Sequence, residues 1–327
     1  MKEATYYRVL EDTLQCQLCP HYCRIDEGET GRCGVRLRQE KRLLESTFGQ
    51  VHALAMDPIE KKPLYHFYPG REILSVGMAG CNLDCGFCQN WRLSRGQAKT
   101  SNYLLPEELV ALARRRNSLG IAYTYSEPSV FYEYVKETAR LAHRSGLKNV
   151  MVTNGYLNRK PLQELLPLID AFNLDLKSIE NDFYRDYCGG ELRPVLNNLQ
   201  LLAESEAHLE VTSLLIPGLN DSEQELRTLT SWLAELHPSL PLHLSRYYPA
   251  HRFSRAATPV KRMLGAKKIA EEKLDFVYLG NLRGAEHRRS SCPECGQPLI
   301  ERSPSITIML EEGLCPACGF QVNIPGL

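Results

Sequence analysis

The sequence predicts an α/β fold built on a parallel sheet, with a small cysteine-rich metal module at each end of the chain. Short apolar, β-branched runs alternate with longer segments of helical period, which is typical of βα units. The twelve cysteines form three groups and one isolated residue, and two of the groups lie outside the alternating region. We therefore expect an N-terminal four-cysteine module at 1–45, a connecting segment at 46–70, a core at 71–283 and a zinc-ribbon-like module at 284–327.

Strands and helices are expected to alternate through the core. The expected strands are 72–78, 120–126, 149–154, 171–176, 209–216, 242–248 and 275–280. One helix is expected to begin at Pro106 and another after Ser222, which together with Glu225 resembles a capping box. Such strand–helix pairs either close into a barrel or lie open as a doubly wound sheet, and periodicity does not choose between them. In both arrangements, functional groups lie where the strands end and the loops begin.

The composition excludes several classes of function. Lysine plus arginine equals aspartate plus glutamate at 39 residues each, so no overall field favours nucleic acid or an anionic membrane. No run approaches the roughly 18 apolar residues of a membrane span, and the first residues lack the apolar stretch of a signal peptide. We expect a cytoplasmic protein in which reduced cysteines serve metal binding or catalysis rather than disulfides.

Three cysteines follow the first core strand within eight residues, as Cys81-x3-Cys85-x2-Cys88. Three thiolates do not saturate a tetrahedral zinc ion, but a [4Fe–4S] cluster held by three thiolates keeps one iron open to a ligand from outside the protein. The alternatives are a structural site completed by a distant histidine or cysteine, and three unrelated buried cysteines. The spacing, with Phe87 just before the third cysteine, favours the open cluster.

The segment "CNLDCGFCQN" resembles the cluster loop of the radical SAM superfamily, in the version found in activating enzymes of glycyl radical enzymes. The resemblance implies a partial (βα) TIM-like barrel and a [4Fe–4S] cluster whose open iron binds S-adenosyl-L-methionine. One electron, from a donor such as flavodoxin or ferredoxin, cleaves this cofactor to methionine and a 5′-deoxyadenosyl radical. The radical then abstracts hydrogen from a substrate that the sequence does not identify.

The resemblance extends to the ends of the later strands. In "YSEP", Glu127 matches the glutamate that receives the cofactor's ammonium group, while two glycines common in the family are replaced by tyrosine and serine. Asn154 in "TNG" is expected to bind ribose or carboxylate, and Asp175 with Lys177 in "DLK" to position the methionyl end. Outside this register they would be only a turn and a rim ion pair. The residues expected to contact the cofactor are Phe87, Gln89, Ser126, Glu127, Asn154, Asp175, Lys177 and Arg246.

Each end of the chain offers four further cysteines. Near the C-terminus, two CPxCG knuckles form Cys292-x2-Cys295-x19-Cys315-x2-Cys318, for which zinc is expected and rubredoxin-like iron is the main alternative. Near the N-terminus, the group is Cys16-x2-Cys19-x3-Cys23-x9-Cys33. Zinc and an auxiliary [4Fe–4S] cluster both fit this second group, and we favour zinc because the segment is too short to make its own core.

The isolated Cys188 precedes two glycines on a loop expected to face the cavity. A structural role is the default, and a catalytic role that quenches a radical or contacts substrate is the alternative. A structural cysteine needs only burial, whereas a catalytic one must reach the cavity.

The whole set of motifs is similar to the radical SAM member of the group called AmmeMemoRadiSam. These motifs are "CxLCPHxC", "CNLDCxFCQN", "YTYSEP" and the CPxCG pair. The group's name points to AMMECR-like and Memo-like proteins as partners. Installation of a glycyl radical on a partner protein is the first alternative function, although the ferredoxin-like insertion frequent in such activases is absent. A non-catalytic iron–sulfur electron carrier or redox sensor and a zinc-stapled interaction protein are the others.

Overall fold

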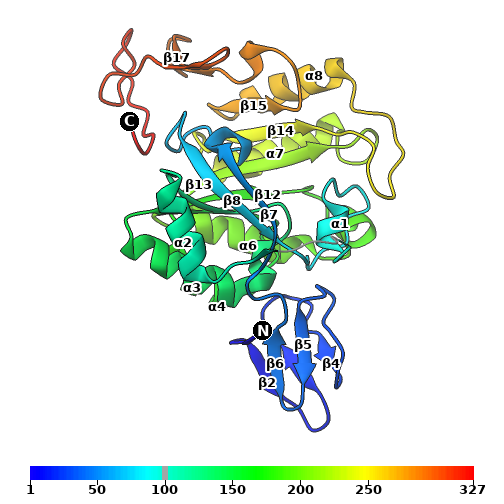
Figure 1. Ribbon diagram of the computed structural model, residues 1–327. Helices are drawn as coiled ribbons and strands as arrows, with labels where there is room; N and C mark the ends of the chain where they lie inside the picture. The colour runs from blue at the N-terminus through cyan, green and yellow to red at the C-terminus, as the bar shows by residue number, and fades with distance from the viewer. Residues whose placement is uncertain (98–101) are drawn as a thin grey trace.

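The computed structural model describes residues 1–97 and 102–327 and has a nine-stranded sheet at its centre (Figure 1). Its parallel strands are β8 (Glu72–Met78), β10 (Gly120–Tyr123), β11 (Lys148–Thr153), β12 (Ala171–Asp175), β13 (His208–Leu215), β14 (Leu242–Arg246) and β15 (Val277–Gly280). Two antiparallel strands, β7 (Gln50–Pro58) and β9 (Asn102–Tyr103), extend the sheet beside β8. Each expected core strand is confirmed, and because the strands follow chain order, the sheet is not doubly wound.

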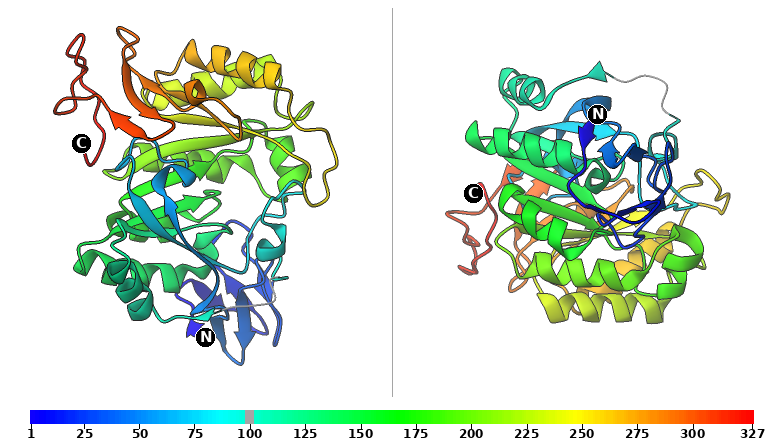
Figure 2. Two further views of the ribbon diagram at one scale, coloured as in Figure 1. Left: turned by 45° about the horizontal axis from the view of Figure 1, so that its top comes forward. Right: turned by 90° about the horizontal axis from the view of Figure 1, so that it is seen from below.

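The sheet forms an open, partial barrel with helices on its outer side (Figure 2). Its edge strands, β9 and β15, do not pair with each other within the described residues. The longer helices are α2 (Pro106–Arg115), α3 (Tyr132–Arg144), α4 (Arg159–Leu165), α6 (Leu192–Ala203), α7 (Glu223–Leu236) and α8 (Val260–Glu271). The shorter ones are α1 (Trp91–Ser94), α5 (Asn181–Phe183), η1 (Ile59–Lys61), η2 (Pro128–Phe131), η3 (Leu166–Leu168), the π turn η4 (Tyr184–Cys188) and η5 (Ala285–His287).

Two helix starts show how the sequence fixes these elements. Pro106 opens α2, where its missing N–H costs nothing, and the Glu108 carboxylate accepts a 2.7 Å hydrogen bond from the backbone N–H of Leu105. The Ser222 hydroxyl accepts from the backbone N–H of Glu225 at 3.1 Å, which is half of the expected capping box. Both helices therefore begin at the end of the sheet where the parallel strands finish.

The strands read as nearly continuous apolar runs because both faces of the sheet are covered. In β8, for example, six of seven residues are buried, with Glu72 the exception. Side chains such as Val76, Ile121, Met151 and Leu174 belong to the main apolar core, which also contains helix residues. Burial on both faces leaves only the strand ends free to present polar groups, which is where the candidate site lies.

The segment 46–70, expected to be a connection, contributes the nine-residue strand β7 to the central sheet. The sequence did not indicate this strand because most of its residues are only half-buried, and Val51 and Asp57 alone are buried. An edge-proximal strand of this kind lacks both the continuous apolar run and the strict alternation that identify strands. The segment is thus part of the barrel wall rather than a linker.

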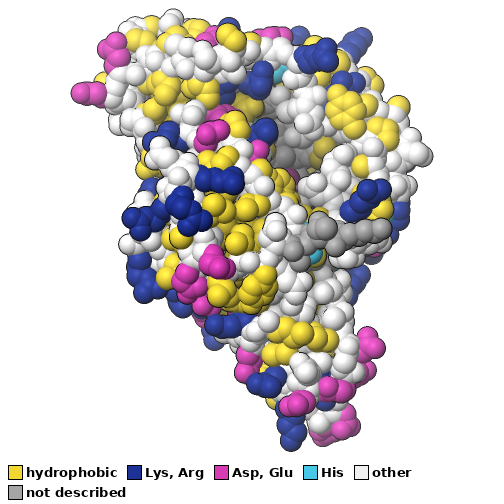
Figure 3. Space-filling view, viewed as in Figure 1, with side chains coloured by type: hydrophobic (Ala, Val, Ile, Leu, Met, Phe, Trp, Pro, Cys, Tyr) yellow, Lys and Arg dark blue, Asp and Glu magenta, His cyan; other side chains and the backbone are white. Residues whose placement is uncertain are grey.

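The N-terminal module is a pair of small sheets at the lower end of the molecule (Figures 1 and 3). Its strands are β1 (Lys2–Glu3), β2 (Tyr7–Val9), β3 (Leu14–Cys16), β4 (Arg24–Ile25), β5 (Arg36–Gln39) and β6 (Arg42–Glu45). The module docks where the parallel strands end: the Glu133 carboxylate of α3 accepts from the Thr5 backbone N–H at 2.8 Å and from Arg36 at 2.5 Å. A buried ion pair therefore ties the module to the barrel.

The C-terminal module packs at the opposite end of the barrel. Its strands are β16 (Ser290–Ser291), β17 (Pro298–Arg302) and β18 (Ile306–Ile308). Its apolar side chains form a separate core with Tyr65, Phe276 and Tyr278, which lie near the starts of β8 and β15. The Arg302 guanidinium donates to the Tyr65 carbonyl at 2.6 Å and stacks 4.5 Å from the ring centroid. Among the described helices, none has the length and apolar character needed to cross a bilayer.

Candidate cofactor site

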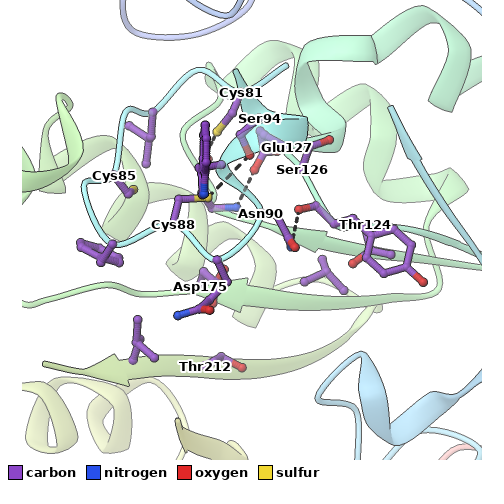
Figure 4. A pocket seen from close by; sticks show the side chains of 18 of the residues that line it. Cys81, Cys85, Cys88, Asn90, Ser94, Thr124, Ser126, Glu127, Asp175 and Thr212 are labelled. Atoms are coloured by element: carbon purple, nitrogen blue, oxygen red, sulfur yellow. Dashed lines mark hydrogen bonds between the residues drawn. The ribbon is translucent and has the colours of Figure 1, made fainter. Parts of the chain in front are cut away.

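A cavity of about 360 Å³ opens where the parallel strands end, and Figure 3 shows the recess near the centre of one face. Its lining draws on the loop after β8 and on the ends of β10, β11 and β12. Figure 4 shows Cys88, Glu127 and Asp175 from three of these segments around the same space. Ten of the residues singled out in the sequence line this cavity: Cys81, Cys85, Phe87, Cys88, Gln89, Ser126, Glu127, Asn154, Asp175 and Lys177. The fold thus gathers residues that are up to about a hundred positions apart into one volume.

The three loop cysteines have raised thiol pKa values. Burial is the main cause for Cys81 and Cys88, and a hydrogen bond with Cys188 followed by burial is the cause for Cys85. Neutral thiols do not bind metal, but a bound metal supplies the positive charge that deprotonates them. Burial therefore keeps these thiols unreactive unless a metal occupies the loop.

The arrangement of the three sulfurs fits a cluster better than a single ion. Within the described residues, the sulfurs of Cys81, Cys85 and Cys88 do not all lie within 4.8 Å of one another, although a single zinc ion would hold them about 3.8 Å apart. A cubane binds each thiolate through a different iron, so it needs wider spacing. Two donors approach the sulfurs at 3.7 Å: the Asn154 amide points to Cys81, and the Ser94 hydroxyl contacts Cys88. The residues present therefore fit a [4Fe–4S] cluster.

Glu127 lies at the end of the β10 segment with its carboxylate almost fully buried. Burial raises its pKa, while three donors stabilise the charged form: the Ser129 N–H at 3.0 Å, the Thr153 hydroxyl at 2.7 Å and the Asn154 N–H at 2.7 Å. A carboxylate has about four acceptor positions, so one remains for a donor in the cavity. The geometry leaves room for a cationic group of a ligand.

The Asn154 side chain is held in place from both sides. Its Oδ1 accepts from the Tyr156 backbone N–H at 2.8 Å, and its Nδ2 donates to the side-chain Oδ1 of Asn82 at 2.9 Å. Asn82 directly follows Cys81 and donates to the Tyr156 carbonyl at 2.6 Å. The two asparagines therefore couple the end of β11 to the cysteine loop.

Asp175, the last residue of β12, forms a 3.4 Å ion pair with Lys177 on the cavity wall. Burial alone would lower the pKa of Lys177, but Asp175 and the thiolate forms of Cys85 and Cys188 raise it well above its usual value. Lys177 is therefore a fixed positive charge beside a carboxylate. Together they can orient a ligand that carries both an ammonium and a carboxylate group.

Two of the expected site residues do not line the cavity. Arg246 ends β14 and turns its guanidinium to the Thr258 carbonyl at 2.7 Å and the Tyr248 hydroxyl at 3.0 Å, whereas Ser245 faces the cavity. Successive strand residues point to opposite faces, which is why only one of the pair reaches it. Cys188 is fully buried at the end of η4, beneath the cysteine loop, where its carbonyl accepts from the Asp84 N–H at 2.7 Å. Cys188 therefore lies against the cysteine loop rather than on the cavity wall.

The sequence did not indicate the part of the site built by β7 and η1. Tyr125 adopts a left-handed backbone, with φ +70°, at a position where the family resemblance expects glycine. Its hydroxyl donates to Asp57 at 2.7 Å, and Lys62 lies 4.7 Å from its ring centroid and 2.9 Å from Asp57. These contacts hold the Tyr125 ring against the cavity wall. They stabilise a left-handed turn that glycine would adopt without strain. The two consecutive lysines, Lys61 and Lys62, were the available signal.

The segment after β14 covers the cysteine loop. Gln89 donates to the Tyr248 carbonyl at 2.9 Å, and Trp91 stacks on His251 with ring centroids 5.0 Å apart. The Phe253 ring lies so close to Gly86 that a β-carbon there would sit 2.5 Å from it. Glycine at position 86 therefore permits the close packing of this cover on the loop.

The C-terminal cysteines form a different kind of group. Among the described residues, Cys292, Cys295, Cys315 and Cys318 are the ones whose sulfurs all lie within 4.8 Å of one another. Two of the sulfur pairs, Cys292–Cys318 and Cys295–Cys315, are 3.6 Å apart. This spacing suits four ligands on one ion.

Comparison with known proteins agrees with this geometry. Residues 75–229 match the Radical SAM superfamily. The chain is 40% identical to the uncharacterized protein MJ0808 of Methanocaldococcus jannaschii, with 99% of both chains covered. It is 24% identical to the pyruvate formate-lyase 1-activating enzyme of Escherichia coli, over 61% of this chain and 83% of that one, and 25% identical to the benzylsuccinate synthase activating enzyme of Thauera aromatica, over 57% and 58%.

Solved structures agree on the fold. Streptococcus suis SuiB bound to S-adenosylmethionine superposes with a TM-score of 0.51 at 12% identity, over 64% of this chain and 52% of that chain. The chain therefore belongs to the radical SAM superfamily, with an α/β radical SAM fold and homology to pyruvate formate-lyase activating enzymes. Members of this family are enzymes, and the family implies a [4Fe–4S] cluster and S-adenosylmethionine.

Proposed function

We propose that Cys81, Cys85 and Cys88 hold a [4Fe–4S] cluster and that S-adenosylmethionine binds beside it in the barrel cavity. The observation that carries this proposal is the convergence of three cysteines, a buried glutamate and an ion pair on one cavity at the strand ends. When bound, the cluster and cofactor supply reductive cleavage of the sulfonium to methionine and a 5′-deoxyadenosyl radical, which takes hydrogen from a substrate.

The chain's own residues bind and orient the cofactor. The free acceptor position of Glu127 receives the cofactor's ammonium group, and Lys177 pairs with its carboxylate while Asp175 holds that lysine in place. Asn154 donates to the Cys81 sulfur and keeps its own side chain fixed through Asn82. Phe87 and the segment that covers it exclude water from the cavity.

At the C-terminal module, we propose zinc as the metal. Four thiolates around one zinc ion at about 2.3 Å lie about 3.8 Å apart, close to the 3.6 Å separations observed. The module at 284–327 shares a small core with Tyr65, Phe276 and Tyr278, and a metal would contribute much of its folding energy. Zinc there would be structural.

The finer assignment is the radical SAM member of the AmmeMemoRadiSam group, with AMMECR-like and Memo-like proteins as partners and flavodoxin or ferredoxin as electron donor. The motifs at both ends of the chain support it, because they lie outside the matched region 75–229. Grouped thiols suit a reducing, cytoplasmic compartment. Activation of a glycyl radical enzyme is the second candidate, supported by the similarity to two such activating enzymes.

The test is cofactor cleavage by protein reconstituted without oxygen. With dithionite as reductant, we expect 5′-deoxyadenosine from the wild-type chain and none from the Cys85→Ala variant. The matched control is Cys295→Ser, which alters the C-terminal group and should keep the activity if the protein stays folded. Absence of product from cluster-loaded wild-type protein would leave the electron-carrier function in its place.

A further inference from the structure

The four N-terminal cysteines surround a small enclosed cavity. Cys16, Cys19, Cys23 and Cys33 all line it, and its volume is about 10 Å³, roughly what one water molecule needs. Around a single zinc ion, four sulfurs at about 2.3 Å from the centre leave no space for even a water molecule. The space among these four cysteines is therefore wider than four thiolates around a single zinc ion would leave.

The separation of these sulfurs points the same way. Within the described residues, no three of the four N-terminal sulfurs lie within 4.8 Å of one another, whereas the C-terminal four all do. The N-terminal group shares this wide spacing with the Cys81, Cys85 and Cys88 loop. Wide spacing is what a cubane requires, because each thiolate binds a different iron.

A buried arginine with unused donors is among the residues that line the same cavity. Arg36 lines the cavity and is 2% exposed, and its Nη1 donates to Glu133 at 2.5 Å. Its Nε and Nη2 have no hydrogen-bond partner among the described residues. Buried N–H groups without partners are costly, so a ligand with several acceptor atoms is expected beside them. The sulfides and thiolates of an anionic iron–sulfur cluster supply such acceptors.

The cavity adjoins the cysteine loop of the barrel. His21 contacts the Asn82 carbonyl at 2.7 Å, and Asn82 lines the N-terminal cavity. A β-carbon at Gly80 would lie 2.9 Å from the Cys33 carbonyl oxygen, so glycine permits the two backbones to touch. Gly80 and Asn82 flank Cys81, which places the two cysteine groups on either side of a single stretch of backbone.

We propose that Cys16, Cys19, Cys23 and Cys33 hold a second [4Fe–4S] cluster, which passes one electron to the cluster site in the barrel. This replaces the zinc that we favoured from the sequence. A reduced flavodoxin or ferredoxin gives up one electron, the N-terminal cluster is reduced by it, and its reoxidation reduces the barrel cluster by one electron. With four cysteine ligands it has no open iron for substrate, which leaves electron transfer as its chemistry. The relay step rests on the function proposed above, whereas the metal assignment does not.

The metal assignment is tested in a chain that lacks the barrel ligands. We expect the Cys81→Ala, Cys85→Ala, Cys88→Ala triple variant, reconstituted with iron and sulfide, to hold about four iron and four sulfide per chain and to give a cubane EPR signal on reduction. Adding Cys19→Ser and Cys33→Ser to the triple variant should remove the bound iron and sulfide and also the EPR signal. Two zinc ions per chain and no iron in the triple variant would overturn the proposal, whatever the fate of cofactor cleavage.

The relay is tested by changing the electron donor. In the Cys19→Ser, Cys33→Ser variant with the barrel ligands intact, flavodoxin-driven formation of 5′-deoxyadenosine should fall about tenfold or more. Formation driven by dithionite, a small reductant that reaches the barrel cluster directly, should stay close to wild type. The relay would be contradicted if the variant kept the wild-type rate with flavodoxin. It would also be contradicted if the variant lost the same fraction of its rate with flavodoxin and with dithionite while the barrel cluster kept its EPR signal.

Discussion

The two four-cysteine groups lie at opposite ends of the barrel and are built differently. The N-terminal group encloses a cavity beside the cysteine loop, and its sulfurs are widely spaced. The C-terminal group holds its sulfurs within 4.8 Å of one another near the starts of the strands, with Cys295 and Cys318 exposed to solvent. The N-terminal group therefore adjoins the candidate cofactor site, and the C-terminal group lies at the other end of the barrel.

The comparison shows that a count of four cysteines does not determine how far apart their sulfurs lie. In the C-terminal group, each CPxCG turn directs both of its sulfurs to one point, so two facing turns make a compact site. In the N-terminal group, the ligands come from strand β3, the turn after it and the approach to β5, which sets them around a wider centre. The two groups are distinguished by the distances between their sulfurs in space.

Metal removal should produce the largest difference in stability between the N-terminal and the C-terminal module. A zinc chelator, added without oxygen, should unfold 284–327, because structural zinc contributes about 10 kcal/mol to such small modules. The same treatment should leave 1–45 protected. Brief exposure to air should do the reverse, since oxygen destroys iron–sulfur clusters and spares zinc thiolates. Hydrogen exchange read separately over the two ranges measures both effects, and identical responses would remove the distinction.

The next largest difference is expected between the two buried arginines. Arg36→Met removes the partner of the buried Glu133 carboxylate and should lower the free energy of unfolding by about 3–5 kcal/mol. Arg302→Met removes hydrogen bonds to Ser290 and Tyr65 but strands no carboxylate, and should cost about 1–3 kcal/mol.

Urea unfolding followed by tryptophan fluorescence compares the two variants. As a control, replacing both members of the N-terminal pair, Arg36→Met with Glu133→Gln, should recover part of the loss, because no buried charge is then left unpaired. Equal costs for Arg36→Met and Arg302→Met would show that the N-terminal ion pair has no special weight.

A pair of glycines tests the close approach of the N-terminal module. Gly80 and Gly70 both have positive φ, at +118° and +82°, so alanine is strained at either position. At Gly80 the new methyl group also collides with Val35 and the Cys33 carbonyl, whereas at Gly70 it makes an ordinary 3.5 Å contact with Ile306. Gly80→Ala should therefore cost about 2–3 kcal/mol and reduce N-terminal iron loading, and Gly70→Ala about 1 kcal/mol. Iron content and thermal unfolding, measured for both variants, test these two expectations.

Much of the fold could be predicted from the sequence for physical reasons. The parallel strands are continuous apolar runs because both sheet faces are covered. Polar residues at the strand ends or in the loops that follow them mark the site, as Glu127, Asn154 and Asp175 do. β7 was missed because half-burial leaves no clear pattern. Asp57 of β7 and Lys62, which follows η1, support the site from a part of the chain that periodicity assigns to a connection.

The remaining differences depend on orientation, which motifs do not encode. Strand alternation decides that Ser245 rather than Arg246 faces the cavity, and this rule could have been applied once the strand was known. The burial of Cys188 depends on the π turn η4 and the left-handed Gly189 that ends it, and a rare turn of this kind has no clear sequence signal. Sulfur spacing in the N-terminal group likewise required the structure.

Acid should destabilise the protein slightly through His66, which packs against Phe276 and Tyr278 at the end of the barrel that the C-terminal module covers. Burial lowers the pKa of His66 to about 3, and the groups that face it are Glu210, Arg302, His208, His243 and Tyr278. Between pH 3 and 6.5 the unfolded chain binds more protons at this residue than the folded one, so stability falls as the pH falls. From pH 6.5 to 5.5 the loss should be about 1 kcal/mol. The His66→Gln variant should show a flatter dependence in urea unfolding at each pH, and an unchanged slope would assign the acid sensitivity to other groups.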